Sequence, residues 1–411
     1  MELKKGYKKS KLGYIPTDWI ECSFEDVLIG FSSGQTPYRA IGRYYTGNIP
    51  WITSGELNYN VITDTNEKIT EEAVKKTNLK KLPIGTFLIA ITGLEAEGTR
   101  GSCAITGVEA TTNQSCMALY PKQSMITTEY LFQFYTQYGN WLAFNYRQGT
   151  KQQSYTGKIA KKLPIILPPT LKEQTAIATA LSDMDELINS LEKLIEKKKA
   201  IKQGVMQELL RPKEGWVVNA PLGNIIYLQG GYAFRSGLFK DIGVPIIRIS
   251  DVGEGGVSLH NCVKYDEINL SESFCVTKGD VLIAMSGATT GKIGVYQESI
   301  KAFINQRVGK FCVHDKRKSS LEFISHLVRG NKFRLGLQKE LAQGAQPNIS
   351  GKQIEAIEVD YPESIDEQLK IATILSDMDD EIMLLEVNLV KYKLLKQGMM
   401  QELLTGKTRL V

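Results

Sequence analysis

The chain has 411 residues, of which 42% are hydrophobic and 23% charged, and its formal net charge is +5. This length suits two or three domains, each large enough to bury a core, in a protein of ordinary globular composition. The sequence contains no apolar run of membrane-spanning length and no apolar N-terminal stretch, so we expect neither a membrane span nor a signal peptide, and a cytoplasmic location.

Residues 1–167 are predicted to form a mixed α/β module. The apolar run at 86–92 (TFLIAIT) is typical of a strand that ends in a glycine turn, and the pattern at 127–143 favours a helix. Basic residues outnumber acidic ones by six to two over 101–171. Locally concentrated positive charge suits a polyanion such as DNA, although ordinary solvated faces look similar.

Residues 168–210 are predicted to form one long helix. Thr170 is placed as its N-cap, with Glu173 three positions later as in a capping box. Apolar residues then follow at spacings of three and four, which indicates a coiled-coil seam. The seam residues of this helix are Ile177, Leu181, Met184, Ile188, Leu191 and Ile195.

Residues 211–361 are predicted to form a second α/β module that resembles the first in outline. The run at 281–286 (VLIAMS) matches the strand at 86–92, and Asn305-Gln306 matches Asn113-Gln114. Between such matches the two modules differ, which indicates one scaffold that carries two different sets of loops. The excess of basic residues over 301–360 is eleven to six.

Residues 362–411 repeat the long helix and add a short tail. Placed 194 positions apart, residues 168–210 and 362–404 are identical at 24 of 43 positions. The second seam consists of Ile371, Leu375, Met378, Ile382, Leu385 and Leu389. Two such seams predict an antiparallel coiled coil, and the recurrence of Gly204 and Gly398 suggests a bend or close packing near each helix end.

The two ends of the chain are expected to lie together. Trp19 occupies the position after the C-terminal tail that Trp216 occupies after the first long helix. The chain is therefore predicted to be pseudo-two-fold and circular in organisation.

Catalytic and metal-binding motifs are poorly represented. The three histidines have no zinc-ligand spacing, and Gly287–Lys292 imitates a phosphate loop but lacks the hydroxyl residue that such a loop requires. The shared LSDMD sequence (181–185 and 375–379) places its aspartates two residues apart on a helix, so we expect a solvated or partner-facing acidic patch and no metal site. We therefore expect a chain without catalytic residues of its own.

Polar loops offer the chemistry of base recognition. Gln and Asn pair with adenine, Arg and Lys with guanine, and Ser or Thr with several partners, although ordinary surface loops have similar compositions. In the first module the candidate DNA-contacting residues are Arg39, Arg43, Thr53, Ser54, Arg100, Gln114, Arg147, Lys151, Gln152, Gln153 and Tyr155. In the second module they are Arg235, Arg248, Ser250, Gln306, Arg307, Gln346, Asn348 and Lys352.

Several motifs occur in a fixed order along the chain. They are LGYIPTDW at 12–19, IPWITSGEL at 49–57, TTNQS at 111–115, the duplicated EQxxIAxxLSDMD and KQGxMQELL of the helices, and LTGKTRL at 404–410. In these motifs and in their order, the whole chain resembles the specificity subunits of type I restriction–modification systems. A departure is the irregular turn at 93–101, beside the more regular 287–294.

The resemblance implies a division into target-recognition domain 1 (1–167), conserved helical region 1 (168–210), target-recognition domain 2 (211–361) and conserved helical region 2 with the tail (362–411). It also implies that each domain reads one half of a bipartite, asymmetric site in double-stranded DNA. The helices would set the spacer and dock two methyltransferase subunits, and a separate restriction and translocation subunit would complete the system. Cofactors would belong to the partners: S-adenosylmethionine, ATP and magnesium. A coiled-coil scaffold without DNA readout and a self-sufficient enzyme are the alternatives.

Overall fold

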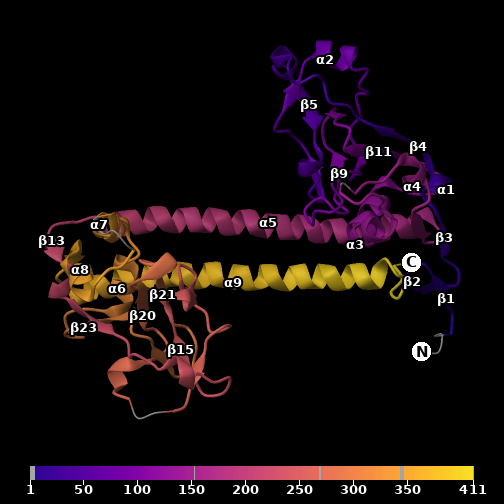
Figure 1. Cartoon of the computed structure of the whole chain (residues 1–411). Helices are drawn as coiled ribbons and strands as arrows, with labels where there is room; N and C mark the ends of the chain where they lie inside the picture. The colour runs from indigo at the N-terminus through magenta and orange to yellow at the C-terminus, as the bar shows by residue number, and fades with distance from the viewer. Residues whose placement is uncertain (1–4, 152, 268–269, 343–346, 411) are drawn as a thin grey trace. The chain divides into compact units, whose positions relative to one another are not determined.

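The computed structural model describes residues 5–151, 153–267, 270–342 and 347–410. The chain folds into two compact units, Met1–Leu191 with Asn388–Val411, and Glu192–Val387. Each unit contains one α/β module together with parts of both long helices, which are labelled α5 and α9 in Figure 1. Within the described residues, no helix is both long enough and apolar enough to cross a membrane.

The first module is built around two sheets. The larger has the strand order β4 (Leu28–Ser33), β11 (Cys116–Pro121), β8 (Phe87–Ala90), β9 (Cys103–Thr106) and β6 (Asn60–Ile62), and the smaller has β10 (Thr111–Thr112), β5 (Ile49–Ile52) and β7 (Lys68–Ile69). Two pairs of strands flank them: β1 (Tyr7–Ser10) with β2 (Gly13–Pro16), and β3 (Ile20–Ser23) with β12 (Pro164–Leu167). The helices are α1 (Phe24–Val27), α2 (Glu71–Lys76), α3 (Thr128–Tyr146) and α4 (Gly157–Lys161), with 3₁₀ turns η1 (Gly42–Tyr45) and η2 (Ser54–Glu56).

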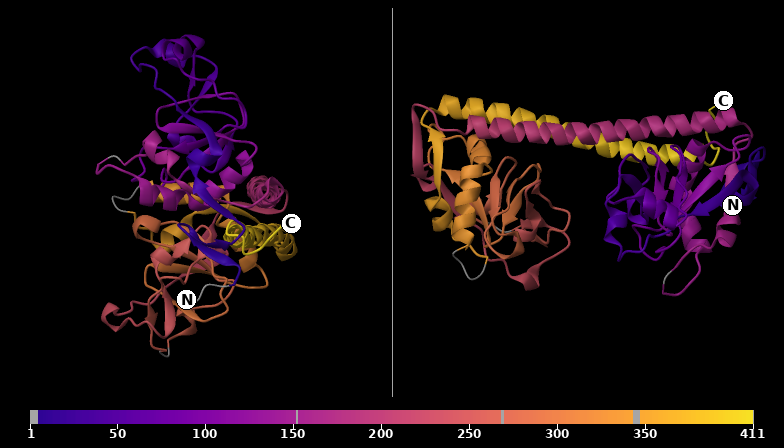
Figure 2. Two further views of the ribbon diagram at one scale, coloured as in Figure 1. Left: turned by 90° about the vertical axis from the view of Figure 1, so that its right-hand side faces the viewer. Right: turned by 90° about the horizontal axis from the view of Figure 1, so that it is seen from above.

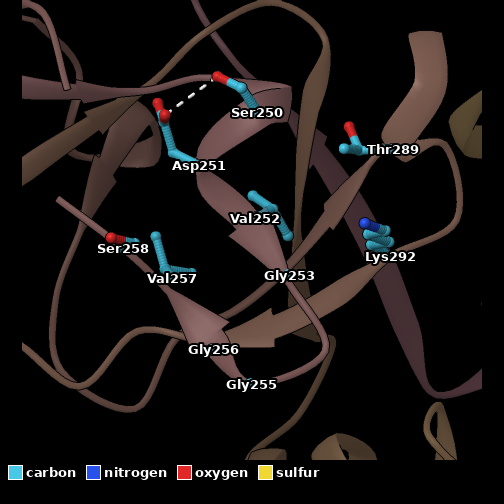
Figure 3. Close-up of a pocket in the computed structure, with 10 residues that line it drawn as sticks. All are labelled: Ser250, Asp251, Val252, Gly253, Gly255, Gly256, Val257, Ser258, Thr289 and Lys292. Carbon is cyan, nitrogen blue, oxygen red and sulfur yellow. Dashed lines mark hydrogen bonds between the residues drawn. The ribbon is translucent and has the colours of Figure 1, made fainter. Parts of the chain in front are cut away.

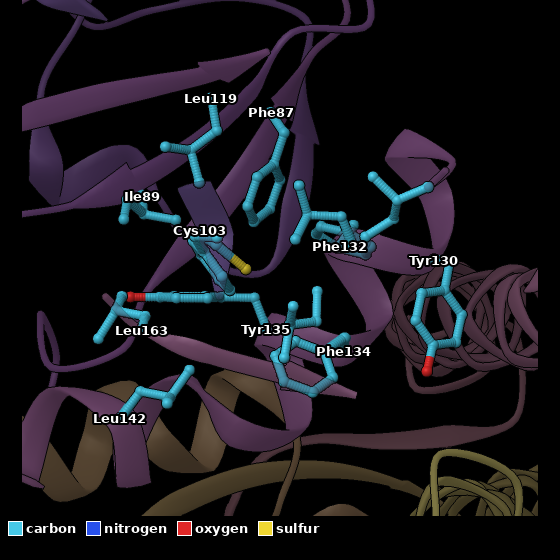
Figure 4. Close-up of a cluster of buried hydrophobic side chains, with 14 of the residues drawn as sticks. Phe87, Ile89, Cys103, Leu119, Tyr130, Phe132, Phe134, Tyr135, Leu142 and Leu163 are labelled. Atoms are coloured by element: carbon cyan, nitrogen blue, oxygen red, sulfur yellow. The ribbon is translucent and has the colours of Figure 1, made fainter. Parts of the chain in front are cut away.

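Strand β8 shows why the first module needs two apolar layers. Alternate side chains of a strand point to opposite faces. Phe87 and Ile89 pack into a cluster with Phe132 and Tyr135 of α3, as Figure 4 shows, whereas the alternate residues of β8 join a second buried cluster. The predicted strand at 86–92 and helix at 127–143 are both present.

The second module repeats this arrangement. Its larger sheet has the order β14 (Ile226–Gly230), β23 (Val308–Val313), β20 (Val281–Ala284) and β21 (Ile293–Val295), and its smaller sheet has β18 (Lys264–Tyr265), β15 (Val244–Ile247), β22 (Ala302–Ile304) and β19 (Cys275–Val276). Strand β13 (Trp216–Pro221) pairs with β24 (Glu358–Pro362), and β16 (Val252–Gly253) with β17 (Gly256–Val257). The remaining elements are α6 (Leu321–Leu327), α7 (Asn331–Ala342), α8 (Gly351–Ala356) and the 3₁₀ turns η3 (Leu222–Asn224), η4 (Ser236–Leu238), η5 (Ile249–Asp251), η6 (Glu272–Phe274) and η7 (Gly287–Thr289).

The long helices are α5 (Leu171–Leu209) and α9 (Ile365–Leu403), each of 39 residues. Thr170 caps α5 as predicted, because its hydroxyl accepts a hydrogen bond from the Glu173 backbone N–H at 3.2 Å. Both helices continue through Gly204 and Gly398, and a Cβ atom at either glycine would have no neighbour within 4 Å. The expectation of close packing at these glycines is therefore wrong.

The two helices run antiparallel within each unit. In the first unit Lys396 of α9 forms an ion pair with Asp185 of α5, and in the second unit Lys202 of α5 forms an ion pair with Asp379 of α9. In the second unit the direction is shown by Lys199, which pairs with Glu386, while Lys202 farther along α5 pairs with the earlier Asp379 of α9. In the first unit, Leu181 packs in one cluster with Met400, while the later Asp185 pairs with the earlier Lys396. Within each unit, Figure 2 shows the segments of α5 and α9 lying alongside one another.

The seam residues are buried to different extents. Ile177 and Leu181 belong to the core of the first module, where they meet Met400 of α9, and their counterparts Ile371 and Leu375 belong to the core of the second module. Farther along, Ile188, Ile195 and Ile382 are buried, whereas Met184, Leu191, Met378, Leu385 and Leu389 are half-buried. Each helix thus begins in a module core and continues as a half-exposed helix pair.

The two ends of the described chain meet in the first unit. Arg409 forms ion pairs with Asp18, at 3.0 Å, and with Glu173 of α5. Gly406 lies so close to the buried Trp19 ring that a Cβ atom there would be 2.9 Å from it. The predicted proximity of the chain ends is confirmed for these segments.

Candidate nucleic-acid interface

In the first module, the candidate residues that follow strands collect at one edge of the sheets. Strands β5 and β10 are parallel neighbours, so the residues after them, Thr53-Ser54 and Asn113-Gln114, emerge side by side. The chain after β4 joins them, because the Gln35 N–H donates to the carbonyl of the last residue of β10 at 3.1 Å. Thr36 Oγ1 also donates to the Gln114 side-chain carbonyl.

The second module forms the corresponding edge. Strands β15 and β22 are parallel neighbours, and Arg248 to Ser250 and Asn305 to Arg307 follow them. The chain after β14 again joins the edge, since the Tyr232 N–H donates to the carbonyl of the last residue of β22 at 2.9 Å. The close approach requires glycine, because a Cβ atom at Gly231 would lie 2.2 Å from the Asn305 carbonyl oxygen.

A polar loop docks onto each edge beside the central strand. In the first module Thr92, just after β8, forms a β-bridge with Ser154 of the loop 147–155. In the second, Ser286, just after β20, forms a β-bridge with Asn348. Gln152 and Gln346, both candidates, lie outside the described residues. We call these surfaces the loop edges: residues 35–36, 53–54, 92–93, 113–115, 148–151 and 153–154 in the first module, and 231–232, 248–250, 285–287, 305–307 and 347–349 in the second.

Exposed candidates lie on or near both loop edges. Gln114 and Lys151 are exposed in the first module, and Arg235, Ser250, Gln306, Arg307, Asn348 and Lys352 are exposed in the second. Arg235 immediately precedes η4 and Lys352 lies in α8, so these two lie beyond the loop edge as defined.

Several other candidates already have partners within the protein. Arg39 forms an ion pair with Glu67 and stacks on Tyr45 at 4.4 Å, and Arg43 forms an ion pair with Glu72. Arg248 donates to the Asn261 carbonyl at 2.8 Å and to the buried carboxylate of Asp251. Thr53 shares a capping box with Glu56, and Ser54 is half-buried. These side chains are held in place and are less free to contact a ligand.

Two candidates serve the fold of the first module. Arg100 donates to the carbonyls of Leu94 and Glu95, and so closes the irregular turn at 93–101. Tyr155 is only 3% exposed, and burial raises the pKa of its phenol well above the ordinary value. Its predicted contact with DNA is therefore wrong, because a buried ring cannot reach a ligand. The neighbouring Arg147 and Gln153 are half-buried, and the Arg147 guanidinium lies over the Phe144 ring at 4.5 Å.

A pocket of about 350 Å³ opens beside the second loop edge. Figure 3 shows Ser250 and Asp251 on one side, joined by a hydrogen bond of 3.0 Å, and Thr289 and Lys292 on the other. The β16–β17 hairpin forms its floor. Lys292 is exposed and carries a positive charge next to the hairpin, so this pocket can accept an anionic group such as a phosphate.

Metal chemistry receives no support from the part of the chain that the structure describes. Within it, no group of three or more His, Cys, Asp or Glu side chains is placed to hold a metal ion. Within the sequence that imitates a phosphate loop, Gly287–Thr289 forms a 3₁₀ turn (η7).

The interhelical ion pairs were missed by the sequence interpretation. Asp185 and Asp379 were predicted to be part of solvated or partner-facing patches. Instead, their carboxylates accept hydrogen bonds from Lys396 and Lys202 of the opposite helix. Asp379 also faces Arg329 at 3.5 Å. The sequence does contain a pattern that indicates these ion pairs, because both the LSDMD and the KQG sequences occur in each copy of the repeat, 194 residues apart.

Beside the second ion pair lies a buried histidine. His326 Nδ1 accepts from Arg329 at 3.1 Å, so the ring donates through Nε2 to Ser376 Oγ at 3.0 Å. Burial, assisted by the Arg329 charge, lowers the pKa of His326 to about 3. In the first unit, Gln133 takes the corresponding place and donates to Ser182 and Asp185 at 3.4 and 3.3 Å.

Two modules of one topology, each with its strand ends gathered at a loop edge, and two repeated long helices define a bipartite recognition protein. A sequence model of the type I restriction modification DNA specificity domain matches residues 16–203 and again 213–390. The chain therefore belongs to this family, and it is a specificity subunit of a type I restriction–modification system, whose partners are DNA and the other subunits of the system.

Relatives and solved structures agree with this assignment. The MjaVIII specificity subunit of Methanocaldococcus jannaschii is 25% identical over 417 residues, covering 96% of this chain and 94% of the relative. The EcoR124I/EcoR124II specificity subunit of Escherichia coli is 25% identical over 188 residues, covering 41% of this chain and 45% of the relative. The fold is similar to that of the crystallised S subunit from M. genitalium, with a TM-score of 0.66, 16% identity and 98% of both chains covered. It is also similar, with a TM-score of 0.55 and 14% identity, to a chain in a structure of complex assembly and conformational transition in the type I system, covering 96% of this chain and 99% of that one.

Proposed function

We propose that each module binds one half of a bipartite DNA site through its loop edge. The observation that carries this proposal is that the two edges have equivalent backbones and different side chains. In the first module Thr53 and Ser115 occupy places that Arg248 and Arg307 occupy in the second. Since sequence is read by side chains at base edges, unlike edges read unlike half-sites and the whole site is asymmetric.

Affinity would come mainly from phosphate contacts. Lys151, Arg235, Lys292 and Lys352 are exposed cations on or near the loop edges. Each phosphate that such a residue neutralises releases counterions, so binding weakens steeply as salt rises. A gel shift at graded salt separates this function from that of a scaffold, which would not bind DNA at any salt concentration.

The long helices would dock the methyltransferase subunits and set the spacer between the half-sites. Large apolar side chains remain exposed along α9, namely Leu369, Ile374, Met383, Leu384, Val387, Val390, Leu394 and Leu395. Exposed apolar side chains in such number indicate a surface that a partner covers. The spacer role rests on the fact that both α5 and α9 contribute to both units.

Catalysis would belong to the partners. We propose that the chain binds no cofactor, and that the modification subunits supply S-adenosylmethionine while the restriction subunit uses ATP and magnesium in the cytoplasm. The purified chain alone should show neither methyl transfer nor DNA cleavage. Either activity in a preparation free of the other subunits would contradict this division of labour.

The decisive experiment exchanges residues 1–167 for the first module of another specificity subunit. Methylated sites are then mapped in cells that express the complete modification complex. One half of the methylated sequence should change, and the other half should stay as it was. Alteration of both halves, or of neither, would contradict modular reading.

A further inference from the structure

Each loop edge contains the same four-residue turn. In the first module the turn is Asn113–Cys116, and the Cys116 N–H donates to the Asn113 carbonyl at 3.3 Å. The Asn113 N–H donates to the Ile52 carbonyl at the end of β5, at 2.9 Å. The Ser115 carbonyl accepts from the Ile91 N–H, just after β8, at 2.9 Å. The turn is therefore held by both neighbouring strand ends.

The turn of the second module, Asn305–Val308, has the same bonds. The Val308 N–H donates to the Asn305 carbonyl at 2.8 Å, and the Asn305 N–H donates to the Ile247 carbonyl at 3.0 Å. The Arg307 carbonyl accepts from the Met285 N–H at 2.9 Å. Because the backbone is fixed on both sides, the side chains at the tip start from a predetermined position.

The two tip residues differ in what they can specify. The first is glutamine in both modules, Gln114 and Gln306, so it cannot account for a difference between two half-sites. The second is Ser115 in the first module and Arg307 in the second. The difference between the turns is therefore concentrated at this second tip position.

Arg307 differs in its surroundings from the other arginine of the second loop edge. Its side chain is exposed, and it has neither an ion pair nor a hydrogen bond from its guanidinium to any residue that the structure describes. Arg248, by contrast, is tied to Asp251 and to a backbone carbonyl. The guanidinium of Arg307 is thus available to an external ligand from a rigid turn.

We propose that Arg307 reads a guanine in the half-site of the second module. A planar guanidinium can donate two parallel hydrogen bonds to O6 and N7 of guanine, an arrangement that the short Ser115 hydroxyl cannot provide. This inference rests on the proposed function, because it assumes that the second module reads a half-site. Beyond the proposed function, it assigns one residue, Arg307, to one base, guanine.

The test uses three variants in the complete modification complex: Arg307→Ala, Arg307→Lys and, as a charge control, Lys316→Ala. Lys316 is an exposed cation beyond the opposite end of β23, so its loss removes the same charge away from the loop edge. Methylated motifs are mapped in cells for each variant, with the exchange of residues 1–167 in parallel to identify the half-site of each module. Melting temperatures of the purified complexes verify folding.

Arg307→Ala should relax the motif at one guanine of the second half-site, with discrimination falling roughly tenfold or more. Arg307→Lys keeps a cation that can still donate to guanine but loses the rigid planar fork, so it should weaken discrimination at the same position less than Arg307→Ala does. Lys316→Ala should leave the motif unchanged. If Arg307→Ala keeps the wild-type motif, or if the relaxed position is not a guanine of that half-site, the assignment is wrong. Should the exchange of modules alter one half-site while the Arg307 variants alter nothing, the proposed function stands and the Arg307 proposal alone fails. If the exchange itself has no effect, the proposed function fails.

Discussion

At the scale of single residues, the interhelical ion pairs explain why LSDMD and KQG are repeated. The pairs Asp185–Lys396 and Asp379–Lys202 are related by the 194-residue repeat, and each forms between the start of one helix and the end of the other. Both lysine side chains are largely buried, at 17% and 15% exposure. A charge in such a place needs its partner, because removing one member leaves the other desolvated and unpaired.

Asp379→Asn should destabilise the second unit by about 1–3 kcal/mol, because it leaves Lys202 and Arg329 without their carboxylate. Urea unfolding of the purified chain measures this loss. Glu386→Gln is the matched control, since its partner Lys199 is 56% exposed, and such pairs contribute at most about 1 kcal/mol. Equal effects of the two substitutions would show that burial of the ion pair is unimportant.

His326 makes the stability of the second unit depend on pH. The pKa of His326 is about 3 in the folded protein, against about 6.5 when exposed. Between these values the unfolded chain takes up a proton that the folded chain does not, so stability falls as the pH falls from about 6.5 to 3. His326→Gln, which copies Gln133 of the first unit, should reduce the loss of unfolding free energy between pH 7 and pH 5 by about 2 kcal/mol. An unchanged pH dependence in urea unfolding would contradict this account.

Some single-residue roles could be predicted from sequence and others could not. Thr170 as a helix cap depends on neighbours three residues away, so the local pattern was sufficient. Tyr155 and Arg100 looked like surface residues in polar loops, yet burial of Tyr155 and the turn closed by Arg100 depend on how the first module folds around them. Arg307 was a candidate from composition, but its lack of partners among the described residues is visible only in the structure.

At the scale of elements, the long helices combine two tasks. Their first turns complete a module core, as Ile177 and Ile371 show, and their later turns pair with the other helix. The helix period and the repeat predicted the existence and length of α5 and α9. The start within each core was not predicted, because apolar spacing alone does not reveal which neighbour covers a residue.

Insertion of one heptad into both helices, between the ion-paired residues, should lengthen the DNA spacer. The insertion sites lie between Asp185 and Lys202 in α5, and between Asp379 and Lys396 in α9. Paired heptads preserve the antiparallel seam and add about 10 Å to each helix, which corresponds to about three base pairs. Methylation mapping reads the spacer directly, and an unchanged spacer in a folded variant would refute the proposed spacing role.

A heptad in α5 alone serves as the control for this experiment. It places the ion-paired residues out of register, because it moves Asp185 and Lys202 seven residues farther apart and leaves the spacing between Asp379 and Lys396 unchanged. The single insertion should therefore lower the melting temperature more than the paired insertion does. If both variants were equally stable, the ion pairs would not define the register.

At the scale of the whole molecule, the chain is a duplication whose first and last described segments meet within the first unit. Arg409 joins the C-terminal segment to Asp18 and to Glu173 of α5 through ion pairs. The duplication was readable from the helices, where identity is high. In the modules the same backbone carries different side chains, so their equivalence became clear only from the strand pairing and the shared turn.

The most direct test of the central claim replaces residues 1–167 with a second copy of residues 211–361, so that both loop edges are the same. Methylated sites are then mapped in cells that express this chain with the modification subunits. We predict a motif in which both half-sites have the sequence read by the second module, with the Arg307 guanine present in each. A motif whose two halves remain unlike would contradict the claim that each half-site is read by its own module.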